Sequence, residues 1–346
     1  MAKRPLTPTV VPATLVVAAA NSLHPERADY RCTGVNDHLV IQAALDALPA
    51  TGGEVKLLDG TYNVEVSLAL DSYQTLRGCG RNTILTTTTA NLDIITAIGG
   101  AGTEKVGILI ADLCVDGPLT NDIGIYFNYV DYSKISTVWS LHNGEAGIQL
   151  NNSDFNTVIG NTCQEANRWG IYLYSSNNNT ITGNTCQGND DDGIWLSYSN
   201  NNTVTGNTCQ GNGFDGIYLH SSNNNTVTGN TCQGNGHDGI YLYSSNNNTV
   251  TGNICFENSQ ITDNSYDNIY LKSSDYNLIA DKTCRRGALA NKPQYGINIS
   301  NAACDHNMIH GNNLYDSGST GDLNDAGTNT HKRDNLSNVG AWLADV

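Results

Sequence analysis

Four aspartates occupy one repeated position of the sequence, directly before a Gly-Ile or Asn-Ile pair. Asp192, Asp215 and Asp238 follow one another at intervals of 23 residues, and Asp267 follows after a six-residue insertion. If each repeat forms one coil of a stacked fold, Asp192 and Asp215 lie roughly 5 Å apart, and Asp192 and Asp238 roughly 10 Å apart. These separations bracket the carboxyl–carboxyl distances of retaining and inverting glycosidases. Like charges at this spacing raise at least one pKa, which suits a general acid.

Residues that could transfer protons or bind carboxylates occur directly before these aspartates in the repeats. An arginine can bind a substrate carboxylate or act as the base of a lyase, and a histidine can relay a proton. Two interpretations without catalysis stand beside this one: the aspartates are corner residues, or they bind a structural Ca²⁺ ion, which prefers clustered oxygen ligands. No other cofactor is expected. The candidate catalytic residues are Asp191, Asp192, Asp215, His237 and Arg168, and the candidate Ca²⁺ ligands are Asp192, Asp215 and Asp238.

An aromatic residue follows the Gly-Ile pair in most repeats, with Gln149 as an exception. Aromatic faces on a rigid sheet can bind sugar rings, and they can equally form a subunit interface. A third interpretation is that outward tyrosines simply favour strands and stack on one another. Counting also the position two places further on, the candidate substrate-binding residues are Tyr172, Tyr174, Trp195, Tyr218, His220, Tyr241 and Tyr243.

These residues are positioned by five copies of one 23-residue repeat. The copies begin at Gly147, Gly170, Gly193, Gly216 and Gly239, and so short and strict a period is typical of a solenoid. Apolar and outward residues alternate in the GIYLY segment, as in a strand with one buried face. Asparagines at positions 179, 184 and 189 suit corners, because Asn tolerates left-handed backbone angles.

The sequence therefore predicts an all-β fold, a right-handed parallel β-helix with 23-residue coils and three faces per coil. Its handedness follows from the usual right-handed crossover between parallel strands. We expect an N-terminal edge strand (14–19) and capping helix, with Asp37 as the helix cap, in residues 1–54, the β-helix in 55–315 and a C-terminal cap or tail in 316–346. The β-helix segment provides roughly eleven coils, a rod on the order of 50 Å long.

The net charge, the cysteines and the N-terminal residues limit which partners and which cellular location are expected. A net charge of −16 disfavours nucleic acid and anionic membranes as partners, and no segment is long enough for a transmembrane helix. Five of the ten cysteines occupy the same inward position of successive repeats, which predicts a reduced ladder rather than disulfides or a metal site. Lys3 and Arg4 precede a short apolar stretch interrupted by Pro12, so we expect no cleavable signal peptide.

Two segments resemble known families. NDHLVIQAALDALPATGGEVKLLDGTYNV (36–64) is similar to the N-terminal part of the pectate-lyase-like β-helix superfamily, which includes phage tailspikes and polysaccharide-processing enzymes. The Asn-x-Ile, Gly-Asn-Thr and Gly-Ile-x-Leu repeats resemble NosD-type repeats, and together the two resemblances cover about residues 29–315. NosD implies copper handling, but Met1 and Met308 are the only methionines and the histidines are scattered, so copper is not carried over.

The polygalacturonase pattern is matched only in part. Asp192, Asp215 and His237 are the nearest equivalents of its acidic and histidine residues. The Asp pair falls on a different coil, Asp238 replaces the second Gly of Gly-His-Gly, and Arg-x-Lys is absent. The resemblance therefore implies the fold and leaves hydrolysis in doubt.

Taken together, these observations predict a glycan-engaging β-helix of the surface, adhesin or virion-spike type, outside the cell, with a polysaccharide as its partner. Catalysis as a lyase or hydrolase is left open. The alternative is a non-catalytic rod or fibre subunit, a homo-oligomer such as a trimer, in which the aromatic residues form the intersubunit face.

Overall fold

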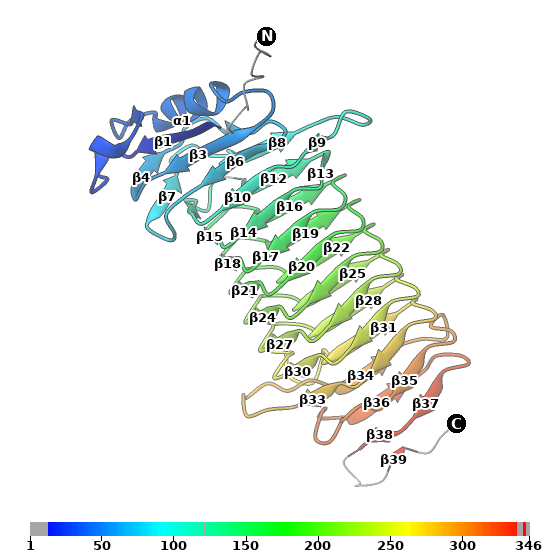
Figure 1. Ribbon diagram of the computed structural model, residues 1–346. Helices are drawn as coiled ribbons and strands as arrows, with labels where there is room; N and C mark the ends of the chain where they lie inside the picture. Colours follow the sequence, from blue (N-terminus) through cyan, green and yellow to red (C-terminus); the bar gives the residue numbers. More distant parts are fainter. Residues whose placement is uncertain (1–12, 121, 338–341, 344–346) are drawn as a thin grey trace, which may run out of the picture.

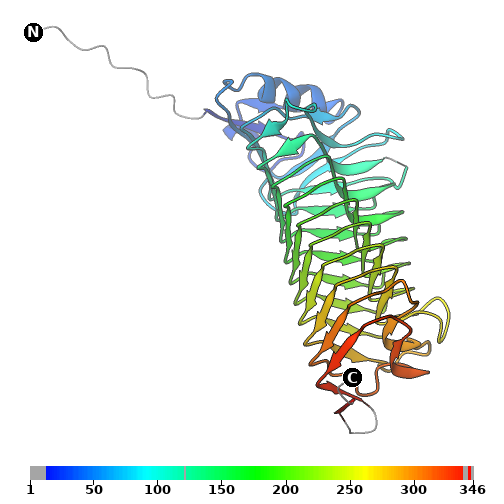
Figure 2. The same cartoon turned by 90° about the vertical axis from the view of Figure 1, so that its right-hand side faces the viewer.

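The computed structural model describes residues 13–120, 122–337 and 342–343, and it shows a parallel β-helix (Figure 1). Short strands stack coil upon coil into three long sheets that run the length of a rod (Figure 2). This arrangement confirms the predicted solenoid. The described termini lie at opposite ends of the rod (Figure 1).

The three sheets are parallel throughout, and most coils add one strand to each. In spatial order, sheet A contains β2 (Tyr30–Arg31), β1 (Ala13–Ala18), β3 (Gly53–Leu57), β6 (Gln74–Arg77), β10 (Leu109–Ala111), β14 (Lys134–Ser136), β17 (Thr157–Ile159), β20 (Thr180–Thr182), β23 (Thr203–Thr205), β26 (Thr226–Thr228), β29 (Thr249–Thr251), β32 (Leu278–Ala280), β35 (Met308–His310) and β37 (His331–Arg333). Sheet B contains β4 (Gly60–Asn63), β7 (Thr83–Thr86), β11 (Cys114–Asp116), β15 (Trp139–Leu141), β18 (Thr162–Gln164), β21 (Thr185–Gln187), β24 (Thr208–Gln210), β27 (Thr231–Gln233), β30 (Ile254–Phe256) and β33 (Thr283–Arg285). Sheet C contains β5 (Leu68–Ala69), β8 (Ile95–Ile98), β12 (Ile123–Asn128), β16 (Ala146–Asn151), β19 (Trp169–Tyr174), β22 (Ile194–Ser197), β25 (Ile217–His220), β28 (Ile240–Tyr243), β31 (Ile269–Lys272), β34 (Tyr295–Ile299) and β36 (Gly321–Asp325).

Two small pairs of strands lie outside these sheets. They are β9 (Lys105–Val106) with β13 (Val130–Asp131), which is parallel, and β38 (Asn335–Leu336) with β39 (Trp342–Leu343), which is antiparallel. A single 3-10 turn (Pro25–Arg27) and the helix α1 (Asp37–Asp46) complete the described elements.

The register of the strands places identical residues directly above one another. Leu196 pairs with Leu219, and Cys186 pairs with Cys209, all with buried side chains. Because side chains alternate along a strand, every coil sends its apolar residues into one continuous core. The outward partners of these positions form columns along the rod, and these columns determine what the surface can bind.

Asparagine ladders hold the corners between strands. The backbone N–H of Asn184 donates to Oδ1 of Asn207 at 2.8 Å, and its Nδ2 donates to the carbonyl of Val158 at 2.9 Å. The same pattern recurs one coil on, where Asn207 donates to Asn230 at 2.9 Å. These side chains satisfy backbone groups that the corner would otherwise leave buried and unpaired. The predicted corner position of these asparagines is confirmed, but the left-handed backbone angles belong to neighbouring residues such as Asn178, Gly183 and Gly188.

The cysteines are free thiols, as predicted. All ten are unpaired, nine are buried, and the five of the repeats stack in sheet B together with Cys284. Their side chains act as small apolar residues of the core.

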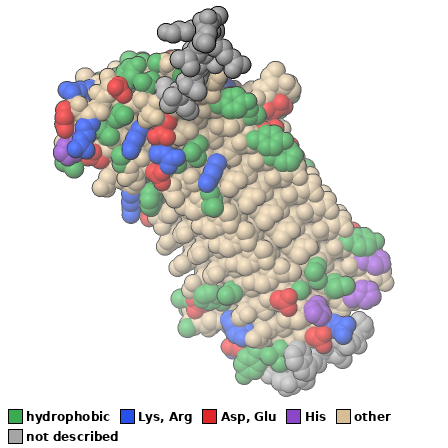
Figure 3. Space-filling view, in the orientation of Figure 1, with side chains coloured by type: hydrophobic (Ala, Val, Ile, Leu, Met, Phe, Trp, Pro, Cys, Tyr) green, Lys and Arg blue, Asp and Glu red, His purple; other side chains and the backbone are tan. Residues whose placement is uncertain are grey.

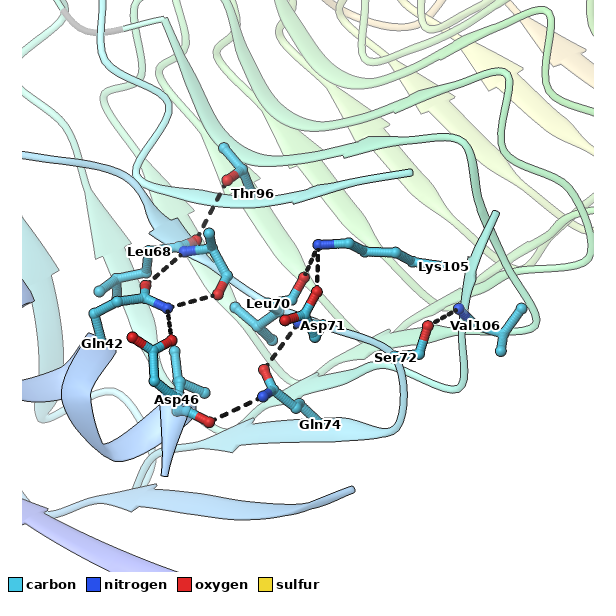
Figure 4. A network of polar contacts seen from close by, with 12 residues as sticks. Gln42, Asp46, Leu68, Leu70, Asp71, Ser72, Gln74, Thr96, Lys105 and Val106 are labelled. Atoms are coloured by element: carbon cyan, nitrogen blue, oxygen red, sulfur yellow. Dashed lines mark hydrogen bonds and ion pairs between the residues drawn. The ribbon is translucent and has the colours of Figure 1, made fainter. Parts of the chain in front are cut away.

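The helix α1 covers the N-terminal end of the rod (Figure 1), as expected for a cap. Gln42 of this helix bonds both the N–H and the carbonyl of Ala69, at 2.9 and 3.0 Å, and Gln74 donates to the carbonyl of Leu45 at 3.0 Å (Figure 4). Lys105 continues this polar network by pairing with Asp71 at 2.8 Å. The helix is therefore tied to the first coils by hydrogen bonds as well as by its apolar face.

Two local predictions at this end are wrong. Asp37 is the first helical residue rather than the cap; the cap is Asn36, and the carboxylate of Asp37 accepts the N–H groups of Gly34 and Asn63 at 2.9 and 3.0 Å. The predicted edge strand is also not at an edge, because β1 pairs with β3 on one side and β2 on the other. A loop folded back over the strand edge explains both differences.

Candidate functional site

The four aspartates form one continuous row immediately before sheet C strands β22, β25, β28 and β31. The carboxylates of the first three aspartates each accept the backbone N–H of the aspartate on the next coil. The distances from N to Oδ1 are 2.9 Å for Asp215 to Asp192, 2.7 Å for Asp238 to Asp215 and 2.5 Å for Asp267 to Asp238. All four side chains are buried. The register predicted for Asp192 and Asp215 therefore brings them to adjacent coils.

Burial makes these carboxyl groups unusually weak acids. Desolvation raises the pKa of Asp192 to about 7 and that of Asp267 to about 7. The pKa values of Asp215 and Asp238 lie well above their ordinary value, because each is desolvated and also has an aspartate neighbour. The row is therefore largely uncharged below neutral pH, and it presents groups that can donate a proton as well as accept one.

Arg168 and Asp191 come together as the sequence suggested, but they form an ion-pair cluster on the outer side. Nε of Arg168 lies 3.2 Å from Asp191, Nη1 lies 3.2 Å from Glu145, and the guanidinium lies 3.7 Å from the ring centre of Trp169. Two carboxylates and an aromatic face thus hold the arginine.

His237 lies three coils from Arg168, on the order of 14 Å away, so these two predicted residues are not brought together. The imidazole stacks instead on Tyr266 and meets Phe214 edge-on, with ring centres 3.9 and 4.3 Å away. Burial lowers the pKa of His237, which keeps the ring neutral at physiological pH. Its position beside the aspartate row is compatible with proton transfer in the neutral form.

The row of carboxyl groups opens into a pocket at its C-terminal end. This hollow of about 190 Å³ is lined by Asp238, Ser265, Tyr266, Asp267, Tyr270, Gln294 and Asn298. Oδ2 of Asp267 accepts Nδ2 of Asn298 at 2.7 Å, and Oδ1 accepts the N–H of Tyr295 at 2.8 Å. These two hydrogen bonds stabilise the ionised form of Asp267 relative to that of Asp238.

Sequence reasoning placed Asp267 in the column but did not include it in the catalytic set, and it missed Tyr266, Gln294 and Asn298. The six-residue insertion before Asp267 was the available signal. Ser259 at its start bonds the backbone of Thr262 and Tyr266, so the insertion folds into a wall that the regular repeats do not have. A break in a strict repeat therefore marks the place where the surface is hollowed.

The predicted aromatic residues form a stacked column on the outward face of sheet C. Consecutive ring centres lie 4.6 Å apart for Tyr172 and Trp195, 5.9 Å for Trp195 and Tyr218, 4.8 Å for Tyr218 and Tyr241, and 4.9 Å for Tyr241 and Tyr270. We call these five residues the sheet C column. Each ring is about one strand spacing from the next, so the column is a continuous aromatic stack beside the aspartate row, in which Tyr172 is buried and the other four rings are half-buried.

A second aromatic line runs next to the sheet C column. Tyr174 contacts Tyr198, Tyr198 contacts His220, and His220 stacks on Tyr243, with ring centres 6.0, 5.4 and 5.4 Å apart. Tyr198 fills the place where Ser197 interrupts the pattern, and the sequence analysis did not identify it. Its left-handed backbone, with φ of 52°, turns the ring back toward the column.

Within the described ranges, no group of three or more His, Cys, Asp and Glu side chains is arranged to hold a metal ion. The Oδ1 atoms of Asp192, Asp215 and Asp238 are occupied by backbone N–H groups. Calcium at these residues stays a prediction. No described helix is long and apolar enough to cross a membrane.

Two family models match the chain, one for its repeats and one for its fold. Residues 106–255 match the family model described as periplasmic copper-binding protein (NosD), and residues 187–337 match that of the right-handed β-helix region. No curated protein matches the chain. The chain is thus a right-handed parallel β-helix with NosD-type repeats.

Solved structures share this architecture at low sequence identity. A mannuronan C-5 epimerase A-module from Azotobacter vinelandii is 21% identical with a TM-score of 0.73, over 88% of this chain and 96% of that one. A tailspike protein of an Escherichia coli bacteriophage is 17% identical with a TM-score of 0.66, over 84% of this chain and 44% of that one. A periplasmic alginate epimerase is 15% identical with a TM-score of 0.54, over 86% and 83%. At these identities the likeness establishes the fold alone.

Proposed function

We propose that this right-handed β-helix binds a polysaccharide along the sheet C column and transfers protons to or from it at the pocket of Asp238 and Asp267. The observation that carries the proposal is the continuous aromatic column directly beside a row of buried carboxyl groups. The parallel rings of Trp195, Tyr218 and Tyr241 cover one another's faces, so the column offers a row of aromatic edges against which the C–H groups of a sugar can pack. The similar structures include epimerases named for mannuronan and alginate and a bacteriophage tailspike protein, which supports a polysaccharide as the partner.

The pocket offers an acid and a base of different strength. Burial and the neighbouring carboxyl group of Asp267 raise the pKa of Asp238 well above its ordinary value, which favours its protonated form, whereas Asp267 has a pKa of about 7 and two hydrogen bonds that favour its ionised form. Asp238 then donates a proton to a leaving oxygen, and Asp267 accepts one or attacks the sugar carbon. On adjacent coils their carboxyl groups lie roughly 5 Å apart, the separation typical of retaining glycosidases.

The same pair can serve a lyase or an epimerase, because both reactions begin with removal of a proton next to a carboxylate. The nearby tyrosines Tyr266 and Tyr270 line the pocket and can contact the sugar. We place the protein outside the cytoplasm, on a cell surface or virion, where polysaccharides are met. The description of the matching family model as periplasmic supports this location.

The test is retention of the protein in gels that contain a polysaccharide. Trp195→Ala and Tyr218→Ala are expected to weaken retention about tenfold each, because each removes one ring from the row that contacts the sugar. Tyr315→Ala removes an exposed ring outside the sheet C column and is the matched control. Thermal unfolding of each variant checks that the rod is intact. Retention of Trp195→Ala and Tyr218→Ala equal to that of the wild type would refute binding at this column.

Turnover is tested separately with acidic and neutral polysaccharides. New reducing ends alone indicate hydrolysis, reducing ends with absorbance from unsaturated products indicate a lyase, and altered sugar proton spectra without cleavage indicate an epimerase. Asp238→Asn and Asp267→Asn are expected to abolish whichever signal appears. If the wild type produces none of these signals but is still retained by the polysaccharide, the aspartate row is structural and the protein is a binding module.

The alternative function is a rod or fibre subunit whose sheet C column forms the intersubunit face. The half-exposed rings of Tyr174 and Tyr198 favour it, since interfaces are enriched in such residues. Sedimentation at micromolar concentration distinguishes the two. A trimer or polymer that Trp195→Ala dissociates supports the fibre, whereas a monomer excludes it.

A further inference from the structure

A second group of exposed aromatic residues lies at the corner between sheet C and sheet A. This corner has a left-handed backbone on every regular coil, and four coils place Asn there: Asn178, Asn201, Asn224 and Asn247, with φ between 57° and 58°. Near the N-terminal end of the rod, the same position is Tyr132 and Phe155, with φ of 50° and 57°. Phe155 lies one coil before Asn178, and Tyr132 lies one coil before Phe155.

Aromatic residues at these positions are unfavourable in two ways. Asn adopts left-handed angles readily, whereas a bulky side chain there is an outlier that costs conformational energy. The rings also stay in contact with water, because Tyr132 is 64% and Phe155 is 46% exposed. The repeat already contains a residue that suits this corner better. An unfavourable local choice that the fold does not need points to a role at the surface.

The two rings form one wall of a hollow. Their planes are parallel within 3° and their centres lie 4.9 Å apart. The hollow measures about 410 Å³ and is lined by Gly107, Ile108, Leu109, Tyr132, Ser133, Lys134, Phe155 and Thr157. On the visible face, hydrophobic side chains lie near both ends of the rod, whereas the middle is covered almost entirely by other side chains and backbone (Figure 3).

Neighbouring residues extend this surface. Tyr73 is exposed and also has a left-handed backbone, with φ of 66°. Its ring lies over Gly107, since a Cβ atom at position 107 would approach Cδ1 of Tyr73 within 2.8 Å. Tyr126 and Tyr129 lead from the first coils of sheet C to Tyr132 on the same coil.

We propose that this corner hollow is a second saccharide-binding site, which takes a sugar unit that carries a carboxylate. The aromatic wall of Tyr132 and Phe155 offers an apolar face to the sugar ring, and Lys134 at the same hollow offers a cation to the carboxylate. A volume of about 410 Å³ suits one or two sugar units rather than a protein segment. The inference rests on the proposed function for its class of ligand, but it uses none of the residues of the sheet C column.

The test replaces each corner ring with the residue that the repeat itself uses. The Tyr132→Asn/Phe155→Asn variant is compared with the wild type by calorimetric titration with oligomannuronate and with a neutral oligomannose of equal length. We expect affinity for oligomannuronate to fall about tenfold and the midpoint of thermal unfolding to stay the same or rise. Tyr276→Asn, which changes an exposed left-handed corner residue outside the hollow, is the control and should bind like the wild type. A Trp195→Ala/Tyr218→Ala variant reports on the sheet C column.

Each outcome separates this inference from the proposed function. If the corner variant binds like the wild type while the sheet C variant loses binding, the inference is wrong and the proposed function stands. If only the corner variant loses binding, the corner site stands and the sheet C proposal fails. If the wild type binds neither oligosaccharide, both are wrong for these sugars. A corner variant that sediments as a smaller species than the wild type would show an interface between copies and would also refute the site.

Discussion

Replacement of Asp192 by Asn should stabilise the protein at neutral and alkaline pH. The carboxylate of Asp192 is buried, and its Oδ1 accepts the N–H of Asp215 at 2.9 Å. An Asn side chain keeps this acceptor, as Asn212 does when it accepts the N–H of Asn189 at 3.1 Å in the corner ladder. The substitution therefore removes only the ability to ionise.

The magnitude follows from the pKa. Burial disfavours the ionised form, so the folded protein binds this proton more tightly than the unfolded chain. The contribution of protonated Asp192 to the free energy of unfolding is fully present below pH 3.8 and is lost progressively as the pH rises to about 7. A rise of the pKa from 3.8 to about 7 corresponds to about 4 kcal/mol of lost stability, since a tenfold change in proton affinity is worth about 1.4 kcal/mol. Asp192→Asn avoids this loss.

Urea unfolding at pH 4 and pH 8 measures the effect. We expect the free energy of unfolding of Asp192→Asn to exceed that of the wild type by up to about 4 kcal/mol at pH 8 and to differ little at pH 4. Asp191→Asn, next to it but paired with Arg168 at the surface, is the control and should show no such gain. A variant that is equally destabilised at both pH values would refute the assignment of a buried, protonated row.

Three further predictions concern the interior of the rod. Leu219→Ala should lower the free energy of unfolding by about 2–5 kcal/mol, because Leu219 is fully buried between identical residues of the neighbouring coils, and urea unfolding measures this. Gly216→Ala should cost at least about 1–3 kcal/mol, since its Cβ would lie 2.6 Å from the carbonyl oxygen of Gly239; a thermal scan in which it melts with the wild type would contradict this. Lys282 is fully buried, its Nζ has no hydrogen-bond partner, and burial lowers its pKa from 10.5 to about 7. Lys282→Met should therefore stabilise the rod by several kcal/mol below pH 7, with the gain shrinking toward pH 10, and a gain independent of pH would contradict the titration.

Much of the fold could be predicted from the sequence because the same pattern of buried, outward and corner residues recurs in five successive coils. The spacing of Cys186, Cys209 and Cys232 fixes the period, the alternation around Ile194 and Leu196 fixes the buried face, and the asparagines fix the corners. Stacking then dictates the register without further information. The N-terminal end has no such repetition, and there the roles of Asp37 and β1 were misjudged because they depend on how one loop folds over a strand edge.

The candidate site was predictable only where it follows the repeat. The positions of Asp192, Asp215 and Trp195 in the columns follow directly from the period. The pocket at Asp238 and Asp267 depends on an insertion whose path the repeat does not specify. The corner rings of Tyr132 and Phe155 were overlooked because their position reads as part of a polar turn, and only the backbone angle shows how unusual these residues are there.

The position of a bound oligosaccharide in a crystal of the protein tests the central claim most directly. Our account predicts sugar rings against Trp195, Tyr218 and Tyr241, with one unit in the pocket between Asp238 and Asp267. An oligosaccharide bound at saturating concentration only on sheet A or sheet B, with sheet C empty, would contradict it.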